Sequence, residues 1–150
     1  MQQSTLKISK VRDVKTPERT GRNAGFDFFV PNDFEETYLE LGGTIRIPSG
    51  IKVRVPEGHS FIAFNKSGIA VNYGLQPGAC VVDENYTGEI HLHMTKTSGK
   101  KTKIKPGMKL VQFLLLKVNY ATVEVCEEGE LYNNFDMDER GENGFGSTGV

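Results

Sequence analysis

The sequence contains no tryptophan and only two cysteines, Cys80 and Cys126. Small secreted domains that depend on disulfides carry more cysteines at closer spacing. The cysteines and the three histidines also lack the spacing of a zinc site. We therefore predict reduced thiols, a cytoplasmic location (the host cytoplasm for a viral protein) and no cluster of metal ligands within the chain.

Long apolar runs are missing as well. The N-terminal residues lack the uninterrupted apolar stretch of a signal peptide. The longest apolar run, residues 110–118, is interrupted by Gln112 and Lys117, and it is far shorter than the ~20 residues that cross a bilayer. The sequence predicts a soluble protein with no membrane partner.

Neither sign of charge dominates. The chain has 18 basic and 19 acidic residues and a net charge of -1, so it has no overall field that would attract a nucleic-acid backbone. The short lysine-rich run at residues 100–103 is interpreted as an exposed hairpin. We expect no nucleic-acid partner.

What the sequence does contain is apolar alternation with a period of two, which is typical of half-buried strands and which recurs at residues 6–11, 51–55, 90–94 and 123–125. Continuous apolar runs indicate strands buried on both faces at 61–64, 80–82 and 113–116, although short core helices fit these runs too. Turn signals built on glycine and proline separate the runs. The pattern predicts an all-β fold, as a sandwich or barrel.

A single short helix is predicted at residues 34–41. Asn32 or Asp33 could cap its N-terminus, and the acidic residues that follow suit a first helical turn.

The chain changes character near its C-terminus, where acidic and polar residues leave little apolar area to bury. We therefore divide it into a core, residues 1–126, and a C-terminal arm, residues 127–150. The arm ends in glycines with Arg140, Phe145, Ser147 and Thr148, which are groups that could bind phosphate oxygens and stack on a ring. A glycine-rich end without fixed structure is the commoner explanation of such a tail.

Three positions inside the core could carry chemistry. Asp83 follows an apolar run beside a tight turn, which suits either a general base or an ordinary turn residue. The sequence Asn65-Lys66-Ser67-Gly68 projects a cation and a hydroxyl from a strand end or turn, which suits either a phosphate contact or a plain hairpin. Gln112 is polar within an apolar run and therefore needs a partner or a ligand.

Taken in order, these segments resemble the five motifs of the trimeric dUTPase family. The motifs are residues 24–28 (AGFDF), 66–70 (KSGIA), 82–89 (VDENYTGE), 106–112 (PGMKLVQ) and 140–149 (RGENGFGSTG). The resemblance implies a jelly-roll-like β barrel that forms a homotrimer, with active sites shared between subunits and closed by a flexible C-terminal arm. It also implies hydrolysis of dUTP to dUMP and pyrophosphate, which limits uracil incorporation into DNA and supplies dUMP for thymidylate synthesis.

The resemblance further implies the roles of single residues. Asp83 would deprotonate the water that attacks the α-phosphorus, Asp27 would support the site, and Mg²⁺ would be held by the triphosphate and water rather than by the protein. The implied substrate-binding residues are Lys66, Ser67, Gly68, Gly78, Val82, Tyr86, Gln112, Arg140, Phe145, Gly146, Ser147 and Thr148. Among them, Lys66 and Ser67 would contact the α- and β-phosphates, Tyr86 the sugar and Phe145 the uracil, while main-chain groups of residues 78–92 would read the base.

Several residues depart from the family pattern. Lys66 and Lys109 stand where arginines are usual, Met108 replaces an acidic residue and Cys80 replaces a glycine. Lysine keeps the charge but loses the two-pronged hydrogen bonding of arginine. The alternatives are a dCTP deaminase, a bifunctional deaminase and triphosphatase, and a non-catalytic nucleotide-binding regulatory module of the same fold. The presence of Asp83 and Tyr86 together with an arm that carries Phe145 favours the hydrolase.

Overall fold

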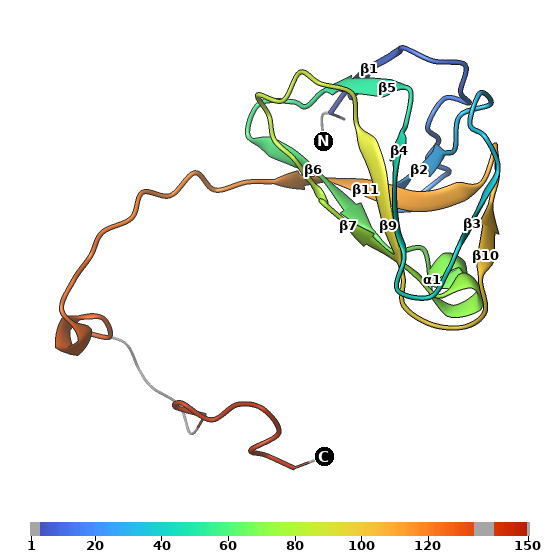
Figure 1. The fold of residues 1–150 in the computed structure, drawn as a ribbon. Coiled ribbons are helices and arrows are strands. Elements are labelled where there is room, and N and C mark those ends of the chain that lie inside the picture. The colour runs from blue at the N-terminus through green and yellow to red at the C-terminus, as the bar shows by residue number, and fades with distance from the viewer. Residues whose placement is uncertain (1–3, 134–139, 150) are drawn as a thin grey trace. The chain divides into compact units, whose positions relative to one another are not determined.

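The computed structural model describes residues 4–133 and 140–149, and the chain separates into two compact units, residues 1–120 and 121–150. The first unit contains the strands and the α-helix of the described chain (Figure 1). In order they are β1 (Lys7–Lys10), β2 (Phe26–Phe29), β3 (Thr37–Leu39), β4 (Thr44–Pro48), β5 (Ile51–Arg54), β6 (His59–Phe64), α1 (Ser67–Tyr73), β7 (Leu75–Gly78), β8 (Val81–Val82), β9 (His91–Lys96), β10 (Thr102–Ile104) and β11 (Lys109–Lys117). The predicted all-β fold is confirmed.

The strands form four antiparallel sheets. The largest has the order β2-β11-β6-β8, and the second has the order β4-β9-β7. Two pairs complete the unit: β1 with β5, and β10 with β3. Neighbours in these sheets come from distant parts of the chain, so the motifs are brought together by strand pairing rather than by sequence proximity.

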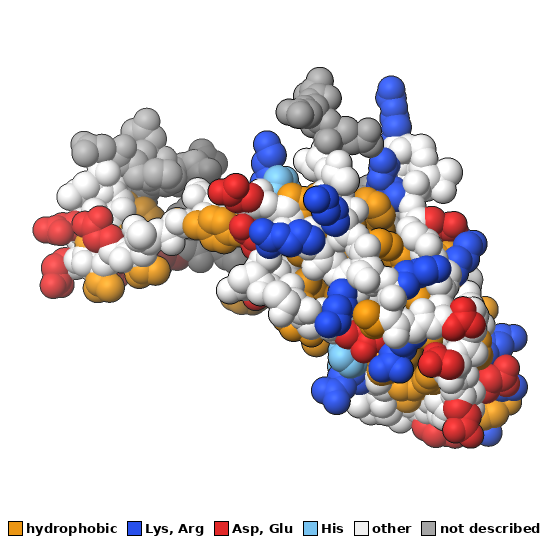
Figure 2. All heavy atoms as spheres, turned by 90° about the horizontal axis from the view of Figure 1, so that it is seen from above, with side chains coloured by type: hydrophobic (Ala, Val, Ile, Leu, Met, Phe, Trp, Pro, Cys, Tyr) orange, Lys and Arg blue, Asp and Glu red, His pale blue; other side chains and the backbone are white. Residues whose placement is uncertain are grey.

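Alternation of burial along the strands explains why these segments pair. In β5, Ile51 and Val53 are buried while Lys52 and Arg54 are exposed, and β9 buries every second residue as well. Because side chains of a strand point alternately to opposite faces, one face of each strand enters the core. The exposed residues of β1 and β5 include lysines and an arginine, and Figure 2 shows basic side chains spread over the surface seen from above.

The buried apolar residues form one cluster at whose centre three phenylalanines meet. The ring centroids of Phe28 and Phe113 lie 4.5 Å apart, and those of Phe61 and Phe113 lie 5.0 Å apart. Such ring pairs contribute about 0.5–1.5 kcal/mol beyond their buried area. They fix the large sheet, because β2, β6 and β11 each contribute one ring.

Three predictions about secondary structure were wrong. Residues 34–41 contain no helix but the strand β3, whose Thr37 and Tyr38 suit a sheet better than a helix and pair with Ile104 and Lys103 of β10. The α-helix of the described chain is instead α1, in a segment predicted to be a strand end or turn.

The strand predicted at residues 123–125 is also absent from the described chain. Val123 and Val125 are 91% and 92% exposed, and no strand of the described residues pairs with them. A strand needs a neighbour to satisfy its backbone hydrogen bonds, so alternation alone does not form one. The second unit contains turns and one 3₁₀ turn, Glu128–Glu130. Within the described residues, no helix is both long enough and apolar enough to cross a membrane.

Candidate functional site

The first, second and fourth motifs meet in the large sheet where β2, β11 and β6 lie side by side. We call this region, which contains Asp27, Lys66, Lys109 and Gln112, the charged edge. Gln112 of β11 lies opposite Asp27 of β2 on one side and opposite Phe64 of β6 on the other. The Lys66 ammonium donates to Asp27 Oδ1 at 2.5 Å, and Gln112 Nε2 donates to the Asn65 carbonyl at 2.8 Å. The structure thus brings together Asp27, Lys66 and Gln112, which the sequence predicted as site residues.

Gly25 of the first motif explains how Gln112 fits at this edge. A Cβ atom at residue 25 would lie 2.2 Å from Gln112 Oε1, which is closer than real Cβ contacts. Only glycine therefore leaves room for the amide. The Gln112 side chain is consequently held from two directions, by the Gly25 backbone and by the Asn65 carbonyl.

Two lysines and two carboxylates form a chain of ion pairs here, in the order Lys66, Asp27, Lys109 and Glu18. Lys109 Nζ lies 2.8 Å from Glu18 Oε1 and 3.7 Å from Asp27 Oδ2. The hydrogen bond with Glu18 raises the pKa of Lys109, and the same bond lowers the pKa of Glu18. Asp27 therefore lies between two ammonium groups, those of Lys66 and Lys109. The ion pair of Glu18 was not predicted, because Glu18 lies 91 residues from Lys109 along the chain.

Ser67 and Gly68 are the first residues of α1, and both are exposed. Lys66 is the N-cap residue of this helix and has an extended backbone conformation, with no side-chain hydrogen bond to the helix. Lys66 is bound to Asp27, so Ser67, the first residue of the helix, lies beside the charged edge.

Asp83 lies in a separate part of the core, immediately after β8. It is exposed and begins a tight turn in which the Tyr86 N–H donates to the Asp83 carbonyl at 3.1 Å. The Tyr86 hydroxyl donates to the Glu89 carbonyl at 2.8 Å, and a Cβ at Gly88 would lie 2.4 Å from that hydroxyl. The Tyr86 side chain therefore closes the turn, with Asp83 exposed at its start.

Two further residues hold this turn, and sequence reasoning missed both. Glu84 Oε2 accepts the Gly58 N–H at 2.9 Å and the Tyr120 hydroxyl at 2.6 Å. The hydrogen bond with Tyr120 lowers the pKa of Glu84 and raises that of Tyr120. The position of Glu84 directly after Asp83 was the available signal. Together with Asp83 and Val118, these side chains line a cavity of about 510 Å³.

The hairpin expected to read the base contains unusual backbone. Gly78 lies where a Cβ would be 2.5 Å from His93 Nδ1, and Ala79 has a positive φ of 51°. His93 Nδ1 is buried and has no hydrogen-bond partner in the described chain. The Cys80 side chain packs against the core, so it is directed away from solvent. Val82 and Tyr86 line a cavity of about 240 Å³ together with His93.

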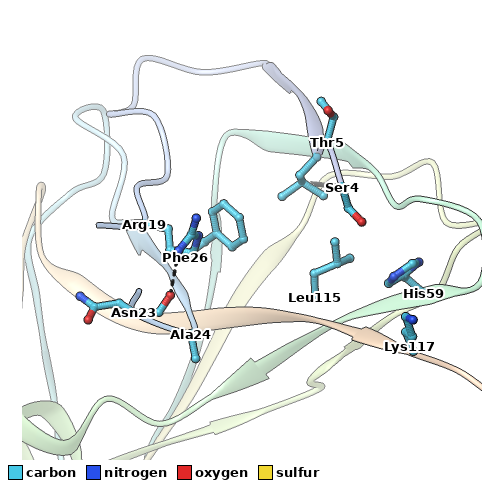
Figure 3. Close-up of a pocket in the computed structure, with 10 residues that line it drawn as sticks. Ser4, Thr5, Arg19, Asn23, Ala24, Phe26, His59, Leu115 and Lys117 are labelled. Atoms are coloured by element: carbon cyan, nitrogen blue, oxygen red, sulfur yellow. Dashed lines mark hydrogen bonds between the residues drawn. The ribbon is translucent and has the colours of Figure 1, made fainter. Parts of the chain in front are cut away.

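A larger cavity of the first unit, about 700 Å³, lies elsewhere (Figure 3). It is lined by Arg19, whose guanidinium lies 5.8 Å from the centre of the Phe26 ring, and by His59 and Lys117. Of the predicted motifs, only residues 24–28 contribute to its wall, through Ala24 and Phe26. Its size therefore does not identify it as the reaction centre.

The fifth motif belongs to the second unit. Arg140, Phe145, Ser147 and Thr148 line one cavity of about 420 Å³ there. The Phe145 ring is fully exposed, and the Ser147 N–H closes a turn on the Gly144 carbonyl at 3.1 Å. The predicted residues of the arm thus gather around a common space within their own unit.

Within one chain, Asp83 lies near one end of β6, and the charged edge lies near the other end. Val82 pairs with Phe61, which places Asp83 near Ser60, whereas Lys66 follows Phe64 at the other end. The strand between Ser60 and Phe64 spans roughly 13 Å at ~3.3 Å per residue.

A family model described as dUTPase matches residues 13–149. The chain belongs to the dUTPase family. The deoxyuridine 5'-triphosphate nucleotidohydrolase of Dictyoglomus turgidum is 33% identical over 145 residues, with 93% of each chain covered. That of Fusobacterium nucleatum is also 33% identical, with 99% of each covered. A segment of the Pol polyprotein of equine infectious anemia virus is 32% identical and covers 89% of this chain, but only 11% of the polyprotein.

Solved dUTPase structures share the fold. A mutant dUTPase of Staphylococcus bacteriophage 80alpha, solved with dUpNHpp, has a TM-score of 0.82 at 21% identity and covers 99% of this chain and 100% of its own. A mutant dUTPase of phage phi11 of S. aureus, in which a structural Mg(II) ion is coordinated, has a TM-score of 0.72 at 20% identity and covers 85% of this chain and 100% of its own.

The described residues of this dUTPase contain no group of three or more His, Cys, Asp or Glu residues arranged to hold a metal ion. The carboxylate of Asp27, at the edge where motifs meet, is already paired with two ammonium groups. This donor set fits an ion that is bound mainly by substrate oxygens and water and only supported by the protein.

Proposed function

We infer that the protein hydrolyses dUTP to dUMP and pyrophosphate. The observation that carries this inference is the match of nearly the whole chain, residues 13–149, to the dUTPase family, with an aspartate exposed at the turn of its third motif. Asp83 orients the attacking water and removes its proton, which is the role of a general base. The contacts of Glu84 and Tyr86 hold the turn that begins at Asp83.

The triphosphate is bound by groups from the charged edge of the sheet. Lys66, Ser67 and Gly68 contact the α- and β-phosphates, and Gln112 contacts the β/γ end. While no phosphate is present, Asp27 pairs with Lys66 and Lys109, and Glu18 also pairs with Lys109. Arg140, Gly146, Ser147 and Thr148 bind the γ-phosphate when the arm closes over the substrate, and Phe145 stacks on uracil.

The deoxyuridine is bound by the third motif. The backbone of residues 78–92 offers donors and acceptors to uracil, and Gly78 and Val82 form part of the wall. The Tyr86 ring excludes a 2′-hydroxyl group. Polar groups left unpaired by the wrong base account for strong discrimination, because an unsatisfied buried donor or acceptor costs about 1–3 kcal/mol.

Mg²⁺ would be held chiefly by the triphosphate and water. When bound, it supplies neutralisation of phosphate charge and fixes the conformation of the phosphate chain. Asp27 supports it from the protein side, through the charged edge that its carboxylate already organises.

A homotrimer with shared active sites is supported by the outer face of the large sheet. Phe64, Val81, Leu116, Val118 and Tyr120 are between 36% and 65% exposed. Strand pairing places the first three on one face with Ile62 and Leu114 between them. An exposed apolar face of this kind marks an association surface. The face borders Asp83, so a second subunit bound there would bring its own phosphate-binding edge to this carboxylate.

The deaminase alternative is not favoured by the comparisons, which name triphosphate nucleotidohydrolases. One assay tests the proposed function directly. The purified protein is incubated with Mg²⁺ and separately with dUTP, dCTP, dTTP and UTP, and the products are separated by chromatography. Conversion of dUTP alone to dUMP and pyrophosphate is expected. Formation of dUTP or dUMP from dCTP, or no turnover at all, would contradict it.

A further inference from the structure

Lys96 is a buried ammonium that the proposed reaction does not use. It is the last residue of β9 and only 2% exposed, and none of the ion pairs of the described residues includes it. Its Nζ donates to the Tyr73 carbonyl at 2.5 Å and to the Ser98 carbonyl at 2.6 Å. A buried ammonium is strongly unfavourable unless its donors are satisfied, so these carbonyls and the lysine fix one another.

Tyr73 is the last residue of α1, so Lys96 holds the end of this helix. The same carbonyl accepts the Thr102 hydroxyl at 3.2 Å, and the Gly74 carbonyl accepts the Thr97 N–H at 2.8 Å. The final carbonyls of a helix have no partner within the helix. Here Lys96, Thr97 and Thr102 supply the hydrogen-bond donors for them. Gly74 has a φ of 60°, and a Cβ there would lie 2.3 Å from the Ser98 carbonyl oxygen, so the two segments are in close contact.

The remainder of α1 is held weakly. No residue of the helix is buried, and Ile69 packs only partly against the core. Just before the helix, Asn65 bonds with Gln112 and Gln76, and at the N-cap the tie is the ion pair of Lys66 with Asp27. That tie is shared with the triphosphate if Lys66 contacts phosphate. The Lys96 anchor is separate from the charged edge, because its ammonium is bound by the Tyr73 and Ser98 carbonyls.

We propose that Lys96 is a positioning residue for triphosphate binding. By fixing Tyr73 at the C-terminal end of α1, it sets where Ser67 and Gly68 stand at the other end of the same seven-residue helix. Lys96 touches neither phosphate nor water and acts only through the helix. This inference rests on the proposed function, which assigns Ser67 and Gly68 to the triphosphate.

The test separates the two halves of the substrate. Lys96→Met removes the ammonium but keeps most of the side-chain volume, and Thr102→Val removes only the second donor to the Tyr73 carbonyl. Lys101→Met is the matched control, since the Lys101 ammonium lies over the Tyr38 ring at 4.7 Å. For each variant, kcat and KM for dUTP are measured with the inhibition constants of tripolyphosphate and of deoxyuridine.

Lys96→Met is expected to raise the KM for dUTP and the inhibition constant of tripolyphosphate by ~10-fold, with deoxyuridine inhibition unchanged and kcat within ~3-fold. Thr102→Val should shift the same two constants by ~3-fold, and Lys101→Met should shift none of them. A merely structural role would lower the melting temperature and leave this asymmetry absent. The proposal is overturned if folded Lys96→Met keeps its KM, or if deoxyuridine inhibition weakens in parallel.

Two outcomes keep this inference distinct from the proposed function. If Lys96→Met does not fold, Thr102→Val decides by the same asymmetry. If the unmodified protein does not turn over dUTP, the proposed function fails, and calorimetric binding of tripolyphosphate to the unmodified protein and to Thr102→Val still tests the anchor. Equal affinities would then overturn it, and weaker binding by the variant would support it.

Discussion

Asp83 is the residue on which the proposed reaction depends most directly. Asp83→Asn keeps the size and the turn but removes the base, so kcat should fall by about 10²–10⁴ while the KM for dUTP changes little. Steady-state hydrolysis measures both constants. Asp33→Asn is the control, because Asp33 is also an exposed turn aspartate and lies outside the motifs. Near-normal turnover by Asp83→Asn would assign the base to another residue.

Gly25 gives a second test at the scale of a single atom. Gly25→Ala should displace the Gln112 amide, since the added Cβ would lie 2.2 Å from its oxygen. We expect the KM for dUTP to rise by ~10-fold, which corresponds to about 1.4 kcal/mol, with the fold retained. Gly129→Ala is the matched control because no atom lies within 4 Å of its Cβ position. An unchanged KM would remove Gln112 from the phosphate contacts.

Single residues differ in how well the sequence predicts them. Asp27, Lys66 and Gln112 were predicted from motif resemblance, and the structure places them in contact. Glu18 and Tyr120 were not predicted, although they fix Lys109 and Glu84. Their partners are tens of residues away, and nothing in a local pattern encodes which distant strands will pair. The catalytic and binding roles themselves stay predictions until they are measured.

At the scale of elements, the turn after Asp83 is joined to the β1–β5 region through Glu89. Its carboxylate accepts from Arg12 Nε at 2.7 Å and from the Gly50 N–H at 2.9 Å. The hydrogen bond from Arg12 is the main cause of the lowered pKa of Glu89, and burial opposes it. Because the pKa is lower in the folded state, the resulting stability is present above the unfolded pKa, and it is lost as the pH falls through the folded one.

Glu89→Gln should therefore lower the melting temperature by about 2–4 °C at pH 7 and flatten its fall on acidification below the unfolded pKa of ~4.3. Thermal unfolding followed by circular dichroism from pH 7 to pH 3 measures this. Glu124→Gln serves as the control, since Glu124 is exposed. If both variants show the acid dependence of the unmodified protein, the Glu89 contacts add no stability.

The elements also show where local patterns stop being informative. Period-two alternation predicted β5 and β9 correctly because one face of each enters the core. Residues 34–41 carried caps and acidic residues typical of a helix, but pairing with β10 made β3 instead. The helix α1 escaped prediction because it buries no residue and therefore lacks an apolar stripe. At residues 123–125 the alternation is present, but a pairing strand is not found among the described residues.

At the scale of the whole molecule, the outer face of the large sheet should control association. Leu116→Asp places a charge among the exposed apolar side chains of that face, since Leu116 pairs with Ser60 and lies on the same face as the pair Leu114 and Ile62. Light scattering after size-exclusion chromatography should give the mass of three 16.6 kDa chains for the unmodified protein and of one chain for the variant, which should also lose turnover. Leu41→Asp, at a different exposed leucine, should leave the trimer intact. A fully active monomer would refute shared sites.

The arm gives the most stringent test of how sites are shared. A chain that ends at Arg140 lacks Phe145, Ser147 and Thr148, so it should form the trimer but not turn over dUTP. Asp83→Asn chains keep the arm but lack the base. When the two inactive proteins are unfolded and refolded together in equal amounts, a site that takes Asp83 from one chain and the arm from another is complete in roughly a quarter of cases, on random mixing in a cyclic trimer.

Recovery of about a quarter of the normal activity per site would therefore show that the arm closes over the Asp83 of a different chain. If each arm closed over its own Asp83, every site in the mixture would lack either the base or the arm, and no activity would return. Refolding the unmodified protein in parallel corrects for losses during the procedure. Mixing without unfolding is the second control, because subunits that do not exchange should remain inactive.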